Sequence, residues 1–297
     1  MIRIPSTSAI TAFSAEHAPV AEVALGEIFE CETADCYHGQ IDSEAVLRPQ
    51  IDMAQFNRAT GPVRIAGVQP GDTIRVDVHA IEIADHGVMA LSPGLGVLGE
   101  RIAEPHTRIV PVSGGNAWIT PDTPVPVAPM IGVLGVAPEG DAIGSSWPGA
   151  HGGNLDTRIL QAGASLLLRA SHEGALLAVG DLHAVQGDGE LGGTGVEIAG
   201  SVRLSVERVS YAGRLPAVRH ADGLSILAGA ETLDEAVRQG FAEAVSLVQT
   251  WRGLSWEDAY RTTSVVVRTE VSQMVNPLKT ARITIPREWC PAELYDL

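Results

Sequence analysis

The chain has 297 residues, of which 45% are hydrophobic and 19% are charged, so it is long enough to bury a sizeable core. Its 36 acidic and 20 basic residues give a formal net charge of −16 at pH 7, which repels nucleic acid and anionic lipid. No run of about 18 apolar residues occurs, so the sequence contains no candidate transmembrane helix. Nucleic acid and membranes are therefore not expected as partners.

The start of the chain and its cysteines bear on the cellular compartment. Residues 1–23 lack a basic segment followed by an apolar one, so no signal peptide is expected and a cytoplasmic location is the default. Cys31, Cys36 and Cys290 are an odd number without metal-ribbon spacing, which suits a reducing compartment. Cys36 could lie near a functional site or could be a small buried side chain.

Alternating apolar and polar residues predict a chain made mostly of β-strands. Residues 62–84 predict a β-hairpin around the turn Gln69-Pro70-Gly71-Asp72. In a strand predicted at Val196–Tyr211, Val202, Leu204 and Val206 are expected to face the core. Four further strands are expected at Arg108–Val112, Ile131–Ala137, Ala164–Arg169 and Ala175–Val179.

Helices are predicted at few places. One is expected just after the segment GNLDTRIL, residues 153–160. A second is expected to start at Thr232, where Thr232 and Glu235 form a capping box, and a third at Ser255 and Asp258. We therefore expect an α+β fold that is predominantly β, with a sandwich-like or barrel-like core and a few attached helices. Residues 1–297 are expected to form one domain, which could comprise a β-rich part (1–140) and an α/β part (141–297).

Polar residues gather among glycines in four segments, where backbone can pass close to an ion or a small substrate because no Cβ obstructs it. They are ETADCYHGQI (32–41), DMAQFNRATGPV (52–63), PGAHGGNLDTRIL (148–160) and AVGDLHAVQGDGELGGTGVEIAG (178–200).

The fourth segment holds the clearest candidate metal ligands. If residues 179–185 are extended, Asp181 and His183 point to the same face, and the turn Gly187–Gly189 brings Glu190 back toward it. Carboxylate and imidazole ligands suit Zn²⁺, Mn²⁺ or Fe²⁺ better than Ca²⁺. The alternative is a surface hairpin with an Asp-Gly turn and solvated acids.

The other segments leave alternatives open. His151, Asn154 and Asp156 could form a second oxygen-rich ion site or a loop that orients substrate, or they could cap a helix. Asp35 could complete a metal site with Asp181 and His183, or it could be a turn residue. Glu173 could reach a site or only begin a turn. No Gly-x-Ser-x-Gly or Ser-x-x-Lys motif supports a serine nucleophile, so water activated on a metal is the favoured chemistry.

The run GNLDTRILQAGASLLLRASHEGALLAVGDLHAVQGDGELGGTGVEI (153–198) resembles the core signature of the acetamidase/formamidase family. The similarity extends to the segments ETADCYHGQI, NRATGPVRIAGVQPGDTIRVDV and PMIGVLGVAPEG before it, and to LSWEDAYRTTSVVVRTEVSQMVNP after it. His38 departs from the pattern, because small or amide residues are more usual there. Twelve residues stand on recurring positions: Asp35, Gln40, Asn57, Asn154, Asp156, Glu173, Asp181, His183, Gln186, Asp188, Glu190 and Glu197.

This resemblance implies a cytoplasmic, metal-binding, homo-oligomeric amidohydrolase that converts small linear amides to a carboxylate and ammonia. Two alternatives are a non-catalytic metal-binding or small-molecule-binding protein of the same fold and a hydrolase of cyclic amides such as lactams. His38 is expected to narrow the pocket and to favour amides of one to three carbons.

The expected roles follow from the resemblance and the local chemistry together. Asp35, Asp181 and His183 are the expected ligands of a divalent metal, most simply Zn²⁺. Glu190 is the expected general base and proton shuttle, or else a fourth ligand, and Gln40 or Asn57 is expected to donate to the developing oxyanion. A second ion such as Ca²⁺, or the substrate, is assigned to a loop set of His151, Asn154, Asp156, Glu173, Asp188 and Glu197.

Overall fold

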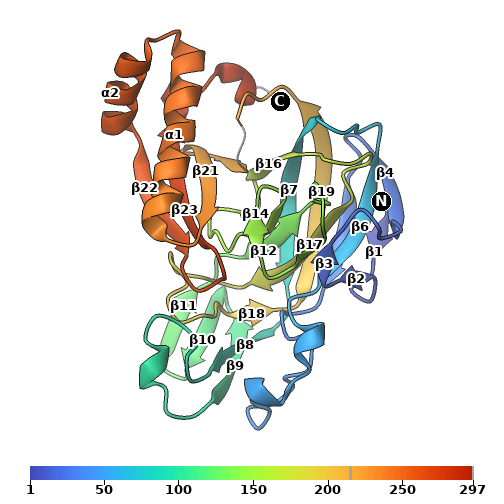
Figure 1. Cartoon of the computed structure of the whole chain (residues 1–297). Coiled ribbons are helices and arrows are strands. Elements are labelled where there is room, and N and C mark those ends of the chain that lie inside the picture. The colour runs from blue at the N-terminus through green and yellow to red at the C-terminus, as the bar shows by residue number, and fades with distance from the viewer. Residues whose placement is uncertain (214–215, 296–297) are drawn as a thin grey trace.

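The computed structural model of the chain describes residues 1–213 and 216–295, and its framework is two large β-sheets (Figure 1). The first sheet has nine strands, antiparallel except for the pair of β1 and β5. Their order across the sheet is β1 (Arg3–Ile4), β5 (Phe29–Thr33), β19 (Gly200–Val209), β7 (Thr73–Ile83), β16 (Ser165–Arg169), β20 (Ala217–His220), β21 (Gly223–Ala230), β23 (Lys279–Pro286) and β22 (Arg268–Gln273).

The second sheet has twelve strands. Nine follow in the order β11 (Thr123–Pro126), β10 (Asn116–Thr120), β9 (His106–Ser113), β8 (His86–Leu91), β18 (Glu197–Ile198), β17 (Leu177–His183), β12 (Met130–Gly135), β15 (Gly152–Asn154) and β14 (Pro148–Gly149). The other three are β6 (Ala59–Ala66), which pairs with β17, and β2 (Ala9–Ile10) and β4 (Ala21–Ala24), which pair with β6. A small separate pair joins β3 (Ala12–Phe13) to β13 (Ile143–Gly144).

Two α-helices, α1 (Leu233–Arg252) and α2 (Trp256–Val266), lie together against β21 and β23 (Figure 1). Thr232 Oγ1 accepts a hydrogen bond from the Glu235 amide at 3.3 Å, and Ser255 Oγ accepts one from the Asp258 amide at 3.1 Å. Both predicted helix starts are confirmed. No described helix combines the length and the hydropathy needed to cross a membrane. Five short 3₁₀ helices lie at Arg48–Gln50, Met53–Gln55, Gly99–Arg101, Arg287–Trp289 and Ala292–Leu294.

The main core lies between the two sheets. It joins Val202, Leu204 and Val206 of the first sheet to side chains such as Ile131 and Val179 of the second, and all five are fully buried. The predicted inward face of the strand at 202–206 is therefore confirmed, as is the predominantly β fold class with few helices. Strands from before and after residue 140 pair in both sheets.

Three local predictions are wrong. Residues 62–84 contain two strands and the predicted turn, but β6 and β7 belong to different sheets, so the turn is a corner and not a hairpin. The predicted strand 196–211 is interrupted at Ala199, which leaves β18 in one sheet and β19 in the other. The helix predicted directly after residue 160 is absent there, because Gly163 takes a φ of +87° and the apolar run after it forms β16.

Candidate active site

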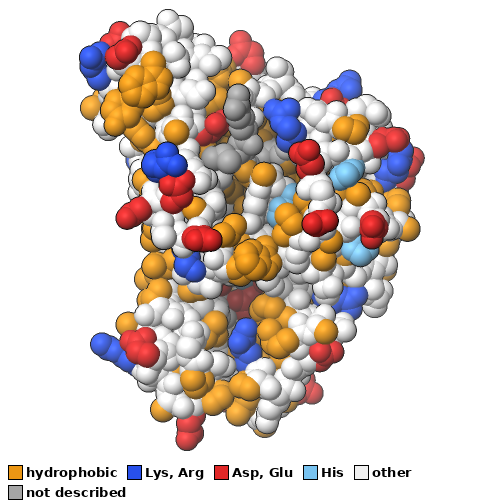
Figure 2. Space-filling model, viewed as in Figure 1, with side chains coloured by type: hydrophobic (Ala, Val, Ile, Leu, Met, Phe, Trp, Pro, Cys, Tyr) orange, Lys and Arg blue, Asp and Glu red, His pale blue; other side chains and the backbone are white. Residues whose placement is uncertain are grey.

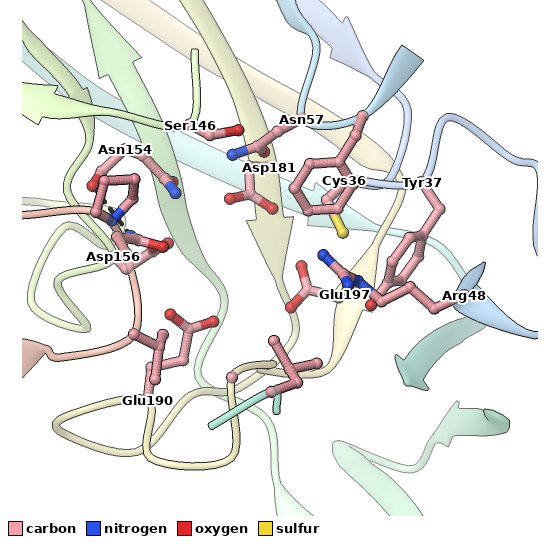
Figure 3. A pocket seen from close by; sticks show the side chains of 16 residues that line it. Cys36, Tyr37, Arg48, Asn57, Ser146, Asn154, Asp156, Asp181, Glu190 and Glu197 are labelled. Carbon is pink, nitrogen blue, oxygen red and sulfur yellow. Dashed lines mark hydrogen bonds between the residues drawn. The ribbon is translucent and has the colours of Figure 1, made fainter. Parts of the chain in front are cut away.

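A cavity of about 200 Å³ opens where loops from distant parts of the chain meet the end of β17 (Figure 3). On one face of the molecule the surface is hollowed above the strands β8 to β10, and acidic side chains are visible there (Figure 2). The cavity is lined by Cys36, Tyr37, Arg48, Phe56, Asn57, Leu95, Ser146, Asn154, Asp156, Asp181, Glu190, Gly193, Glu197, Val275, Asn276 and Pro277.

Four of the lining residues have a backbone conformation that side-chain-bearing residues rarely adopt. Asn57, Asp156, Asp181 and Glu190 have φ between +39° and +56°, in the left-handed region. Each such residue costs on the order of 1–3 kcal/mol and persists only where the surrounding structure holds it. These turns aim four polar side chains at one space, so the local strain indicates a functional site.

The first group of side chains centres on His183, which is 1% exposed at the end of β17. Its Nε2 atom lies 2.8 Å from Glu197 Oε2 and 3.3 Å from Asp181 Oδ1. Glu197 Oε1 accepts a hydrogen bond from the Gly195 amide at 2.9 Å, so β18 and the loop before it fix this carboxylate. Asp181 and His183 therefore lie close together, as the sequence predicts.

A second contact fixes the orientation of the imidazole. His183 Nδ1 lies 2.6 Å from Gln186 Oε1, and Gln186 Nε2 donates to the Asp156 carbonyl at 2.8 Å. Because the Gln186 oxygen can only accept, the proton of the neutral ring sits on Nδ1. The lone pair of Nε2 then faces the two carboxylates, as in a histidine that ligates a metal.

The second group pairs Asp156 with Glu190. Ligand atoms of these two residues and of His183 all lie within 4.8 Å of one another. Asp156 Oδ2 accepts a hydrogen bond from Asn276 Nδ2 at 2.5 Å, while Asp156 Oδ1 has no hydrogen-bond partner among the described residues. Gly132 makes this crowding possible, because a Cβ there would lie 2.6 Å from Asp156 Oδ1 and 2.8 Å from Asp181 Oδ2.

Burial and mutual repulsion govern the protonation of these carboxyls. The pKa of Asp181 is raised to about 8, mainly by burial, with His183 opposing the rise and Glu197 adding to it. Burial and the charge of Asp156 raise the pKa of Glu190 well above its usual value. Burial also opposes ionisation of Glu197, yet the neighbouring His183 outweighs it and holds the pKa of Glu197 at about 2. Glu197 therefore ionises much more readily than Asp181 beside it.

The C-terminal hairpin of β22 and β23 holds the loop that carries Glu190. The Gly189 amide donates to the Ser272 carbonyl at 3.0 Å, and the Met274 amide donates to the Gly189 carbonyl at 3.1 Å. Arg282 is 2% exposed and contacts Asp188 Oδ1 at 2.5 Å. Asp188 therefore anchors this loop and does not line the cavity.

Besides Asp188 and His183, four predicted site residues also lie outside the cavity lining. Asp35 Oδ1 accepts a hydrogen bond from the Gly39 amide at 3.1 Å, as a turn residue does. The side-chain oxygen of Gln40, Oε1, accepts a hydrogen bond from the Asp52 amide at 2.7 Å. Glu173 pairs with Arg64 at the surface. His151 is buried against Phe13, with ring centroids 5.1 Å apart.

The remaining predicted residues do line the cavity: Asn57, Asn154, Asp156, Asp181, Glu190 and Glu197. His183 is not part of the lining, but it contacts two lining residues, Asp181 and Glu197. His38 was expected to narrow the pocket but lies outside the lining, with its Nε2 3.2 Å from Arg58 Nη1.

Several lining residues were not assigned a role from the sequence. Cys36 lines the cavity, and its ligand atom lies within 4.8 Å of those of Asp181 and Glu197. Arg48, Ser146 and Asn276 lie in segments whose local sequence patterns carry no metal or catalytic motif. Asn276 falls in the segment SQMVNP, so the family resemblance was the one available signal for it.

Comparisons with known proteins identify relatives of this chain. The chain matches an acetamidase from Mycolicibacterium smegmatis with 27% identity, over 64% of this chain and 63% of that protein. The curated relatives it matches are longer, and the match spans 60–63% of their length.

Two solved structures are similar over nearly the whole chain. An acetamidase from Bacillus halodurans has 38% identity and a TM-score of 0.95, covering 99% of this chain and 98% of that one. A protein described as a predicted acetamidase/formamidase from Thermoanaerobacter tengcongensis has 39% identity and a TM-score of 0.95, covering 99% and 97%. The model of the Acetamidase/Formamidase family matches residues 12–149 and 145–213, which is more than half of the chain. The chain therefore belongs to the acetamidase/formamidase family.

Proposed function

We propose that this protein is a metal-dependent amidase that hydrolyses small linear amides to a carboxylate and ammonia. Membership of the family supports the reaction class. The single observation that carries the proposal is the convergence of Asp181 and Glu197 on Nε2 of His183. A buried imidazole flanked by two carboxylates offers the mixed nitrogen and oxygen donors that a divalent cation can use.

The spacing of the three donors fits a divalent cation. With zinc–ligand bonds of about 2.0–2.2 Å, neighbouring ligand atoms lie roughly 3.0–3.5 Å apart. The separations of 2.8 and 3.3 Å around His183 Nε2 are close to that value. We assign Asp181, His183 and Glu197 as the ligands, with Glu197 in place of Asp35, and Zn²⁺ as the metal, because mixed imidazole and carboxylate donors suit it. A cation bound there would polarise a carbonyl oxygen and make water more acidic.

Asp156 and Glu190 handle protons in this scheme. Two buried carboxyls this close cannot both ionise readily, and burial raises the pKa of each above its usual value. Glu190 can accept a proton from the attacking water and deliver it to the nitrogen that leaves as ammonia. Asn57 lines the same cavity and is the remaining candidate donor to the oxyanion, since Gln40 is committed to its loop. We assign this pair to proton transfer in preference to a second ion such as Ca²⁺.

The cellular setting is part of the same proposal. All three cysteines are free thiols, and two of them are buried, which supports a reducing location such as the cytoplasm. Assembly into a homo-oligomer stays a prediction of the family resemblance.

Ammonia release over a panel of amides tests the function. Formamide, acetamide and propionamide are expected to be cleaved at rates that change gradually with chain length, because each methylene alters discrimination by only about 1–3 kcal/mol. Phe56, Leu95, Val275 and Pro277 give the cavity, which measures about 200 Å³, more apolar wall than the sequence indicated.

The panel also separates the alternatives. A non-catalytic binding protein would bind metal and release no ammonia from any amide. A lactamase would cleave 2-pyrrolidinone in preference to the linear amides. Faster cleavage of benzamide or a dipeptide than of acetamide would contradict the pocket assignment.

Metal binding is expected to expel protons. Without metal, Glu197 and Asp181 outweigh the effect of burial and raise the pKa of His183 well above its usual value, while Asp181 has a pKa of about 8. Both groups therefore carry protons at pH 7 and must lose them to act as ligands. Zn²⁺ should bind more tightly as pH rises from 6 to 8, with more than one proton released at pH 7. Calorimetry in buffers of different ionisation enthalpy measures this number, and release of no protons would contradict the ligand assignment.

A further inference from the structure

The cavity contains one cationic side chain that the chemistry above leaves unused. Arg48 begins the first 3₁₀ helix and lines the cavity beside Tyr37 and Phe56. Figure 3 shows its side chain reaching toward the centre of the cavity, across from Asp156 and Glu190. Every other charged residue in the lining is acidic.

Arg48 has no partner for its charge among the described residues. No described carboxylate forms an ion pair with it, and its side chain makes no hydrogen bond there. Its guanidinium carbon lies 5.4 Å from the centre of the Phe56 ring, a cation–π contact that supports the face of the group. The N–H edges remain available to a ligand.

A planar guanidinium with free edges is matched by a carboxylate, which can accept two parallel hydrogen bonds from it. Had Arg48 served only to offset the acidic cavity, one of the four lining carboxylates would be expected to contact it, and none does. Asp156 and Glu190 lie across the cavity from Arg48 (Figure 3), and Glu197, which is nearer to it in this view, forms its ion pair with His183.

We propose that the preferred substrate is an amide whose acyl chain ends in a carboxylate, the half-amide of a short dicarboxylic acid, and that Arg48 binds this carboxylate. This inference rests on the proposed amidase function. Water adds to the amide carbon, the C–N bond breaks, ammonia leaves, and the distal carboxylate is unchanged, so the product is the dicarboxylate.

Substrate pairs of equal chain length test the proposal. The ratio of kcat/KM for malonamate over propionamide, and for succinamate over butyramide, should exceed about 10 for the natural protein in at least one pair, given the strength of charge-assisted hydrogen bonds. R48Q should lower that ratio at least tenfold, mainly through KM for the carboxylated substrate. R48K should restore part of it, because lysine keeps the charge but not the two-pronged geometry.

A matched control is available in Arg252, which lies 5.0 Å from the Trp289 ring and outside the cavity. R252Q should leave both ratios unchanged. A natural protein without preference for the carboxylated amides, or an R48Q variant that loses activity equally on both members of a pair, would overturn the proposal. An R48Q variant in which only inhibition by acetate changes would also overturn the proposal, since Arg48 would then bind the product alone.

Binding separates this inference from the amidase function itself. Calorimetry with the E190Q variant, with and without R48Q, measures the affinities for succinamate and butyramide without turnover. Tighter binding of succinamate that is lost with R48Q supports the inference even if the protein releases no ammonia. Equal binding of both ligands overturns it even if acetamide is hydrolysed.

Discussion

Replacing Glu190 with Gln is expected to lower kcat for acetamide by at least about a hundredfold while the metal content stays the same. The change keeps the size of the side chain and removes the group that can accept and deliver a proton. Glu190 is 7% exposed and lies beside Asp156, so a carboxylate from the buffer cannot enter and take over its position. Steady-state ammonia release and metal analysis of the same sample give the two readouts.

Glu173→Gln is the matched control. Glu173 belongs to the same sequence motif but pairs with Arg64 at the surface, so its replacement should change kcat by less than about twofold. Loss of metal from the E190Q variant would place Glu190 among the ligands. Unchanged turnover would end its catalytic role.

Replacing His183 with Ala is expected to abolish metal binding and, with it, turnover. The substitution removes the one imidazole in the proposed ligand set and leaves Asp181 and Glu197 buried beside an empty space. Removing a partner from buried charged groups also destabilises the fold, by about 3–5 kcal/mol. Metal content after dialysis against Zn²⁺ and the urea midpoint are therefore measured together.

His220→Ala provides the comparison for this variant. His220 is a partly buried histidine that contacts Ser225 Oγ at 2.8 Å, outside the cavity. It should lose some stability and keep its metal. A folded His183→Ala protein that retains stoichiometric metal would remove His183 from the ligand set.

How far the site could be predicted from the sequence depends on how local each contact is. Asp181 and His183 are two residues apart, so their proximity follows from the chain itself, although Asp181 is left-handed with φ +54° and not in the regular extended conformation assumed. Glu190 returns to the same cavity by the short turn at 187–189. These contacts need no knowledge of the sheets.

Contacts between distant segments could not be placed in this way. The alternation in residues 62–84 predicts two strands and a turn, but it carries no information about which strands they pair with. The two strands pair in different sheets, so the predicted hairpin is a corner between the sheets. The sequence offers Asp35 either as a third ligand beside Asp181 and His183 or as a turn residue, and in the structure its carboxylate accepts a hydrogen bond from the Gly39 amide within a turn. Arg48 and Asn276 reach the cavity only because the loops at 36–57 and 275–277 pack over the end of β17.

The proposed metal dependence is tested by the rate of ammonia release from acetamide by metal-depleted protein, before and after stepwise addition of Zn²⁺. We expect little activity without metal and a rise that stops once the site formed by Asp181, His183 and Glu197 is filled. Full activity in protein shown by elemental analysis to contain no metal would contradict it, as would the absence of ammonia at saturating Zn²⁺.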